Sequence, residues 1–155
     1  MEEQLSVRNL QASDRALFMA MMNEFYHSSA TLHPISDEQL QKIFDLSLES
    51  SPYYRAVVLL IDETVVGYAH LSFTHSNEVA GMVLLIEELY IRPEYRGKGI
   101  GSQFFSWLFD NYRDRMKRFR LEAVPQNEGA IRLYGRHGFT ELAYKQMVYD
   151  FHQST

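Results

Sequence analysis

A turn rich in glycine and positive charge lies between residues 90 and 101, where the chain reads "YIRPEYRGKGIG". Residues 92–101 contain three glycines and three cationic side chains, and they follow a strand-like run and open a helix-like one. The N-terminus of a helix carries unpaired amide groups and a partial positive charge. Glycine leaves room for an anion to approach those amides. The pattern therefore indicates a binding site for a phosphate or pyrophosphate.

Two better-known phosphate motifs do not match this turn. A P-loop requires G-x-x-x-x-G-K-[ST], which "RGKGIGS" lacks. A dinucleotide fingerprint requires G-x-G-x-x-G, and Ser102 takes the place of its third glycine. From the glycines alone, a plain tight turn without a ligand is an equally good interpretation.

Two adjacent glutamates, Glu87 and Glu88, interrupt the apolar run "MVLLIEELYI" of residues 82–91. Carboxylates are costly to bury within a sheet. Because side chains alternate along a strand, we expect one glutamate to face a cleft and the other to face the opposite side. An exposed pair at the end of a strand, without a function, is the alternative.

A second group of polar residues lies in "NEGAIRLYGRHGF", residues 127–139. Asn127 and Tyr134 are seven residues apart, which is two helical turns, so they share one face of a helix. Asn127 is also a good N-cap, and Gly138 is a good left-handed stop. Core packing is the alternative role for Tyr134.

The elements that must position these residues follow from periodicity and capping signals. The turn links a strand to a helix in which Ile100, Phe104, Leu108 and Tyr112 recur every four residues. Strands are predicted at residues 7–10, 56–61, 65–75, 82–91, 119–124 and 144–150, and helices at 13–26, 36–50, 100–115 and 127–138. This order is that of a mixed α/β protein with an antiparallel meander in its first half.

Composition narrows the classes of protein. The chain has 155 residues, no cysteine and a net charge of -5, so it suits one domain without disulfides or thiolate chemistry. Residues 1–91 carry 4 basic and 13 acidic side chains, whereas residues 92–120 carry 8 and 3. Two explanations of this uneven charge are equally good. One is a solvated surface that is lopsided by chance, and the other is an anionic ligand near the turn with a cationic partner near the first half. No nucleic-acid stripe, membrane span or signal-peptide core is present, and we expect a cytoplasmic protein.

The stretch "LYIRPEYRGKGIG" resembles the strand, loop and helix of the GNAT N-acetyltransferase superfamily, whose signature is R/Q-x-x-G-x-G/A. The stretch "NEGAIRLYGRHGF", twenty-six residues after Gly101, resembles that superfamily's second motif, N-x-x-A-x-x-L/F-Y-x-x-x-G-F. The resemblance implies a single domain over residues 1–155. It implies a mixed sheet, with an antiparallel meander followed by splayed parallel strands, and about four helices.

The resemblance also implies acetyl-CoA as co-substrate and no metal. The pyrophosphate would lie on the turn, and the pantetheine arm would pair with the edge of the preceding strand and contact Asn127. The Tyr134 hydroxyl would protonate the departing thiolate. The implied cofactor-binding residues are Leu89, Tyr90, Ile91, Arg96, Gly97, Lys98, Gly99, Ile100, Gly101, Ser102, Asn127 and Tyr134.

For the acceptor, the resemblance implies an amine that attacks the thioester directly. In spermidine/spermine N-acetyltransferases a Glu-Asp pair lies at the same offset from the turn, which makes Glu87 the candidate base and Glu88 a contact for a cationic substrate. The helix–loop–helix and the third strand would wall the acceptor site, with candidate residues Tyr26, His27, Tyr68 and His70. We expect a small cationic amine. The alternatives are a protein N-terminus or lysine as acceptor, or a CoA-binding sensor without catalysis. Homodimers are common in this superfamily, so a homodimer is compatible with the resemblance.

Overall fold

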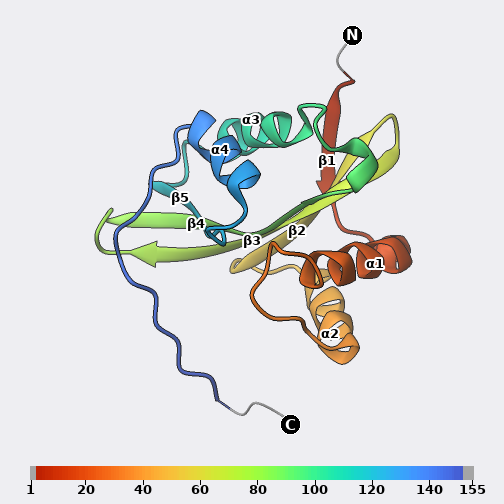
Figure 1. The fold of residues 1–155 in the computed structure, drawn as a ribbon, viewed down its shortest axis with the longest axis horizontal. Coiled ribbons are helices and arrows are strands. Elements are labelled where there is room, and N and C mark those ends of the chain that lie inside the picture. Colours follow the sequence, from red (N-terminus) through yellow and green to blue (C-terminus); the bar gives the residue numbers. More distant parts are fainter. Residues whose placement is uncertain (1–2, 152–155) are drawn as a thin grey trace.

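The computed structural model describes residues 3–151, and its elements follow the predicted order as far as α4 (Figure 1). The sheet contains β1 (Leu5–Asn9), β2 (Tyr54–Ile61), β3 (Thr64–Ser76), β4 (Gly81–Ile91) and β5 (Arg118–Leu121). The helices are α1 (Arg15–Tyr26), α2 (Asp37–Ser47), α3 (Ile100–Tyr112) and α4 (Glu128–Arg136), with single 3-10 turns η1 (Ala12–Asp14) and η2 (Pro93–Tyr95).

The five strands lie side by side in sequence order, β1-β2-β3-β4-β5. The first four pair antiparallel, and β4 pairs parallel with β5. That parallel pairing joins Val83–Ile86 to Arg118–Leu121 and then stops, although β4 continues to Ile91. The predicted meander and the splayed parallel pair are therefore confirmed.

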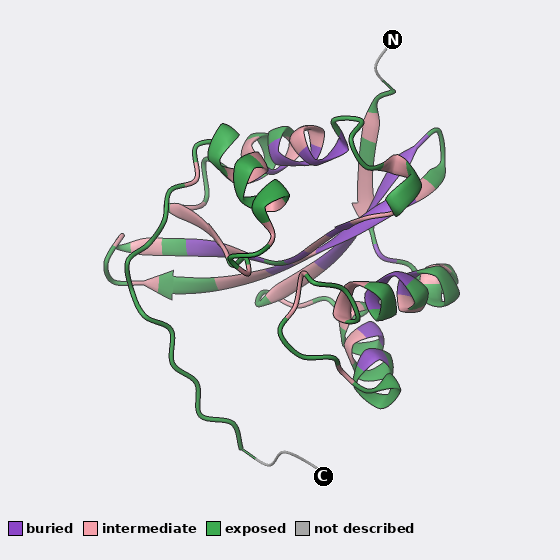
Figure 2. Ribbon diagram, viewed as in Figure 1, coloured by how far each residue is buried: buried purple, intermediate pink, exposed green. Residues whose placement is uncertain are grey.

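Helices cover both faces of the sheet, with α1 and α2 on one side and α3 and α4 on the other (Figure 1). The neighbouring residues Val57 and Val58 are both fully buried, on opposite faces. Val57 belongs to the core that contains α3, and Val58 to the core beneath α1 and α2. This explains why β2 is an unbroken apolar run rather than an alternating one. Figure 2 shows the buried residues concentrated in the central strands and on the inner sides of the helices.

Local signals set where the helices begin. Ser36 caps α2 by accepting a hydrogen bond from the Gln39 amide at 3.2 Å, and the Gln39 side chain accepts one from the Ser36 amide at 2.8 Å. Together these two hydrogen bonds form a reciprocal capping box. Asn127 caps α4 through the Ala130 amide, and Gly138 follows that helix at a φ of 90°. Within residues 3–151 no helix combines the length and the apolar character that a bilayer crossing requires.

The strand predicted at residues 144–150 is wrong. This segment has no regular secondary structure and extends away from the sheet (Figure 1). A strand needs a neighbour for its backbone groups, and this stretch pairs with none of the described strands. Similarly, β5 ends at Leu121 rather than at residue 124, because β4 diverges from it beyond Ile86.

Candidate active site

The glycine turn joins the end of β4 to α3 and exposes a run of backbone amides. Gly97 and Gly99 adopt left-handed conformations with φ of 74° and 81°, and Gly99 is the N-cap of α3. The first hydrogen bond of the helix runs from the Gln103 amide to the Gly99 carbonyl. In the described part of the chain, the amides of residues 97–102 have no hydrogen-bond acceptor. Unpaired amides of this kind, at the N-terminus of a helix, suit an anionic ligand.

The three glycines have different physical roles. A Cβ at Gly97 or Gly99 would have no atom within 4 Å, so these two are required for backbone conformation and leave open space above the amides. A Cβ at Gly101 would lie 2.9 Å from Leu133 Cδ2. Gly101 therefore allows α3 and α4 to approach each other closely.

The cations of the turn are held by neighbouring groups. Arg96 Nε donates to the Ile91 carbonyl at 2.7 Å, and its guanidinium lies 5.4 Å from the Tyr90 ring centroid. The Lys98 ammonium lies 5.5 Å from the ring of Tyr95. Both charges thus lie against aromatic rings close to the glycine turn.

One contact at this helix start was missed by the sequence reasoning. Ser102 Oγ lies 3.0 Å from His137 Nε2, which links the first turn of α3 to the end of α4. His137 also packs against Phe105 at 5.0 Å. Its position three residues after Tyr134 hinted at a shared helix face, but the 35-residue separation from Ser102 concealed the pairing.

The splay of β4 from β5 leaves one edge of β4 unpaired beyond Ile86. Leu89, Tyr90 and Ile91 lie in this stretch, where they still pair with β3 on the other edge. Backbone groups that face the gap can pair with an extended ligand. This is the geometry that the predicted pantetheine site requires.

The two glutamates do not point to opposite sides of the sheet, which corrects the expectation from simple alternation. In the β3–β4 register His70 is opposite Glu88 and Leu71 is opposite Ile86, so Glu87 is the extra residue of a β-bulge. Glu87 accepts a hydrogen bond from Ser72 Oγ at 3.1 Å. Ser72 shares its face of β3 with His70, on the α1–α2 side, where Glu88 also lies. The bulge therefore brings both carboxylates to one face.

Glu88 is the more unusual of the pair, because it is only 5% exposed. The Tyr68 hydroxyl donates to its Oε1 at 3.0 Å. Burial raises the pKa of Glu88 to about 7, although hydrogen bonding from Tyr68 and Tyr26 opposes the shift; the charge of Glu87 adds to it. The same burial, together with Glu88, raises the pKa values of Tyr68 and Tyr26. Both phenols thus stay protonated around a carboxylate that titrates near neutrality.

The two histidines predicted near the acceptor site, His27 and His70, contact neighbouring residues other than the two glutamates. His70 Nε2 lies 3.1 Å from Ser47 Oγ of α2, and its ring stacks on Tyr54. Burial lowers the pKa of His70 and favours its neutral form. His27 ends α1, where its Nδ1 lies 2.7 Å from the Asn23 carbonyl oxygen, and it is exposed. Of the predicted acceptor residues, the structure brings together Tyr26, Tyr68 and Glu88.

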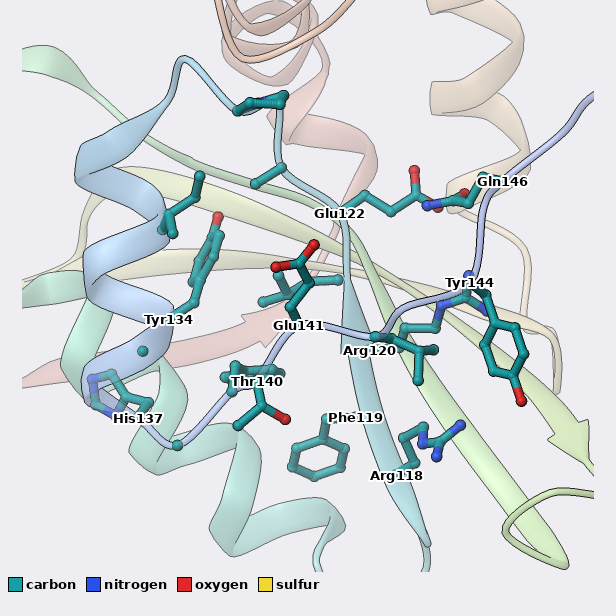
Figure 3. Close-up of a pocket in the computed structure, with 18 of the residues that line it drawn as sticks. Arg118, Phe119, Arg120, Glu122, Tyr134, His137, Thr140, Glu141, Tyr144 and Gln146 are labelled. Carbon is teal, nitrogen blue, oxygen red and sulfur yellow. The ribbon is translucent and has the colours of Figure 1, made fainter.

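Tyr134 lies on α4 and lines a cavity of about 800 Å³ between α4 and β5 (Figure 3). Its ring meets Phe105 edge-on at 5.8 Å, and burial raises its pKa. Its hydroxyl has no hydrogen-bond partner within residues 3–151 and is not sealed from solvent. Asn127, two turns away, uses its side-chain oxygen to cap α4. Tyr134 is the only predicted site residue that lines this cavity.

A family model, "Acetyltransferase (GNAT) family", matches residues 18–139. The chain belongs to this family, and it is an acetyl-CoA-dependent N-acetyltransferase. The turn fits the co-substrate, since its unpaired amides and open glycines suit a pyrophosphate. Within residues 3–151, no group of three or more His, Asp or Glu side chains could hold a metal ion.

Two curated relatives carry specific names. The thialysine N-epsilon-acetyltransferase of Sus scrofa is 26% identical over 94% of this chain and 89% of its own length. The spermine/spermidine N(1)-acetyltransferase of Bacillus subtilis (strain 168) is 29% identical over 56% of this chain and 60% of its own.

Solved structures share the fold at lower identity. A possible acetyltransferase from Clostridium difficile 630 superposes with a TM-score of 0.81 at 19% identity, covering 97% of this chain and 100% of that one. An aminoglycoside N-acetyltransferase in complex with CoA gives a TM-score of 0.72 at 12% identity, covering 97% and 96%.

Proposed function

We propose that this chain moves the acetyl group of acetyl-CoA to the primary amine of a small cationic acceptor, by direct attack of the amine on the thioester. The observation that carries the proposal is the pair of carboxylates on the α1–α2 side of the β4 bulge, next to the unpaired edge of β4. Two carboxylates and two phenols suit a cationic amine better than an anionic or apolar acceptor. The names of both relatives, which refer to small amines, agree with this choice.

Each site residue has a chemical task in this proposal. The amides of residues 97–102 hold the pyrophosphate, and the thioester of acetyl-CoA supplies an activated acetyl group. Glu87, which is exposed and bonds to Ser72 Oγ, accepts the proton of the attacking amine, directly or through water. Glu88 attracts the positive charge of the acceptor once it is ionised. The Tyr134 phenol, kept protonated by its raised pKa, returns a proton to the leaving thiolate.

The acceptor class is tested by mass spectrometry of reactions that contain the full chain, acetyl-CoA and one candidate acceptor. The panel should include thialysine, lysine, spermidine, an aminoglycoside and a short peptide with a free N-terminus. We expect single acetylation of one or more of the small amines. Acetylation of the peptide alone would overturn the small-acceptor assignment, and CoA binding without turnover of any amine would favour a sensor.

The roles of the two glutamates are separated by their pH profiles. Glu87→Gln should depress kcat most at low pH, where the amine is hardest to deprotonate, and recover in part as pH rises. Glu88→Gln should instead raise KM for the amine, and it should remove any fall in KM as pH increases through about 7. If only Glu88→Gln produces the low-pH loss of kcat, then Glu88 is the base.

A further inference from the structure

A second cavity, of about 540 Å³, lies at the end of α3 that is farther from the glycine turn. Tyr112, the last residue of this helix, and Arg115, just beyond it, line the cavity. Residues 47–52, which lead from α2 to β2, and Arg55 in β2 are also part of its wall. The length of α3 at about 1.5 Å per residue places the cavity about 20 Å from the turn. None of the residues predicted for the acetyl-CoA or acceptor site lines it, so it is a separate space.

Two guanidinium groups converge on Tyr112 at this cavity. Arg55 Nη1 donates to the Tyr112 hydroxyl at 2.8 Å, and the Arg115 guanidinium lies 4.7 Å from the centroid of the same ring. Arg55 Nε also donates to Asn9 Oδ1 at 2.7 Å, and Arg115 Nη2 donates to the Asn111 carbonyl at 3.1 Å. Because each guanidinium carries five N–H donors, most of these donors have no protein acceptor within residues 3–151.

The charges of these two arginines are not neutralised by a carboxylate in the described chain. No Asp or Glu of residues 3–151 forms an ion pair with Arg55 or Arg115, whereas Arg8 pairs with Asp14 at 2.8 Å. One carboxylate, that of Glu49, lines the cavity, but its side chain is exposed and is bound to neither arginine. Two like charges held beside one ring repel each other, and an anion between them would relieve this repulsion.

The rest of the lining suits the body of a small organic molecule. It combines serine hydroxyls with apolar side chains, namely Ser50, Ser51, Leu10, Phe73, Met82 and Met116. The volume lies within the range of about 300–1,000 Å³ that small-molecule sites occupy. Arginine is the side chain best suited to carboxylate and phosphate groups, because its planar fork can donate two parallel hydrogen bonds. The cavity therefore offers a cationic end and an apolar wall.

We propose that this cavity is a binding site for a small organic anion. Its carboxylate or phosphate group lies between the guanidinium groups of Arg55 and Arg115, and its apolar body lies against Phe73 and Met116. Such a ligand differs in charge from a cationic amine, and it binds at the opposite end of α3 from the pyrophosphate turn. The proposal does not rest on the identity of the acceptor amine or on acetyl transfer.

Three probes that share one ring test the proposal on the full chain: phenyl phosphate, benzoate and the neutral benzamide. The Arg55 guanidinium lies 5.6 Å from the ring centroid of Trp107, the one tryptophan of the chain, so tryptophan fluorescence reports on the site. We expect a saturable change with at least one of the two anions, with a dissociation constant below about 1 mM, and none with benzamide. The anion that binds more tightly identifies the head group. Equal responses to all three probes, or no binding of either anion, would overturn the proposal.

Variants of the two arginines locate the bound anion. Arg115→Gln should raise the dissociation constant at least about tenfold, because it removes hydrogen bonds between charged groups. Arg115 is exposed, so its replacement should leave the fold intact. The matched control is Arg113→Gln, which removes the same charge from a residue that does not line the cavity and should change binding less than about twofold. Arg55→Gln should weaken binding as well; it is measured by calorimetry, because Arg55 itself contacts Trp107. Equal losses in the Arg113 and Arg115 variants would refute a specific site.

A titration in the presence of CoA separates this cavity from the glycine turn, which also suits anions. The two places are about 20 Å apart, which exceeds the screening length of about 8 Å at physiological ionic strength, so CoA should change the dissociation constant of the anion less than about twofold. Displacement of the anion by CoA would assign it to the turn and would overturn the proposal. A failure of CoA itself to bind would count against the acetyltransferase assignment and is measured separately, by calorimetry with CoA alone.

Discussion

The buried carboxylate of Glu88 makes the stability of the fold depend on pH in an unusual direction. Its pKa rises from 4.5 to about 7 on folding, chiefly because the side chain is buried. The folded state therefore binds more protons than the unfolded state between these two values, and the free energy of unfolding falls as pH increases through this window. A shift of this size corresponds to about 3 kcal/mol at 1.36 kcal/mol per pKa unit. This stabilisation is present below pH 4.5 and is lost above about pH 7.

Replacing Glu88 by glutamine should remove this dependence. The amide oxygen can still accept the hydrogen bond of the Tyr68 hydroxyl, but the group no longer ionises. Unfolding in urea, followed through Trp107, the one tryptophan of the chain, gives the free energy at each pH. We expect the variant and the wild type to be similar in stability near pH 4.5. Above pH 7 the variant should be more stable by up to about 3 kcal/mol.

Comparison of the variant with the wild type cancels the titration of the other carboxylates. The matched control is Glu87→Gln, which removes the neighbouring charge at an exposed position and should leave most of the pH dependence in place. Parallel stability curves for wild type and Glu88→Gln between pH 4.5 and 8 would refute the reasoning, because Glu88 would then titrate alike in the folded and unfolded states.

Three further predictions concern the turn and the leaving group. Gly99→Asp should raise the dissociation constant of CoA at least about tenfold, or about 1.4 kcal/mol, by placing an anion at the pyrophosphate site. In calorimetry the neutral variant Gly99→Asn should lose less CoA affinity, and an equal loss of affinity in the two variants would show that charge is not the cause. Gly101→Val should lower the free energy of unfolding by about 1–3 kcal/mol through its clash with Leu133. Chemical denaturation should show that adding Leu133→Ala restores part of the lost free energy of unfolding. If the double variant is no more stable than Gly101→Val, another contact is responsible for the loss. Tyr134→Phe should lower kcat roughly 10²-fold with CoA affinity unchanged; undiminished turnover would leave Tyr134 a packing role only.

Much of the backbone geometry of the candidate cofactor site could be predicted because its determinants are local. The left-handed conformations of Gly97 and Gly99 and the cap formed by Asn127 depend on a few consecutive residues. Such features leave a pattern in the sequence that needs no knowledge of distant contacts. The role of Gly101 was not predictable in this way, since the reason for it is Leu133 on another helix.

The strand predicted at residues 144–150 shows the limit of periodicity. Its aromatic and β-branched residues are typical of a strand, but pairing requires a neighbour, and the described chain provides none at the edge of β5. Periodicity describes which side chains favour burial. It does not identify the surface against which they are buried.

The sequence by itself determined the order of the elements as far as α4, the glycine turn before α3 and the family, because each is encoded in contiguous residues or in motifs at a recognisable spacing. Only the tertiary structure decided the environment of the two glutamates. One extra residue in the β3–β4 register brings Glu87 and Glu88 to the same face, and packing beneath α1 and α2 buries Glu88 and raises its pKa to about 7. Register and burial arise from contacts between residues far apart in the chain, and identical neighbouring residues can therefore acquire different chemistry.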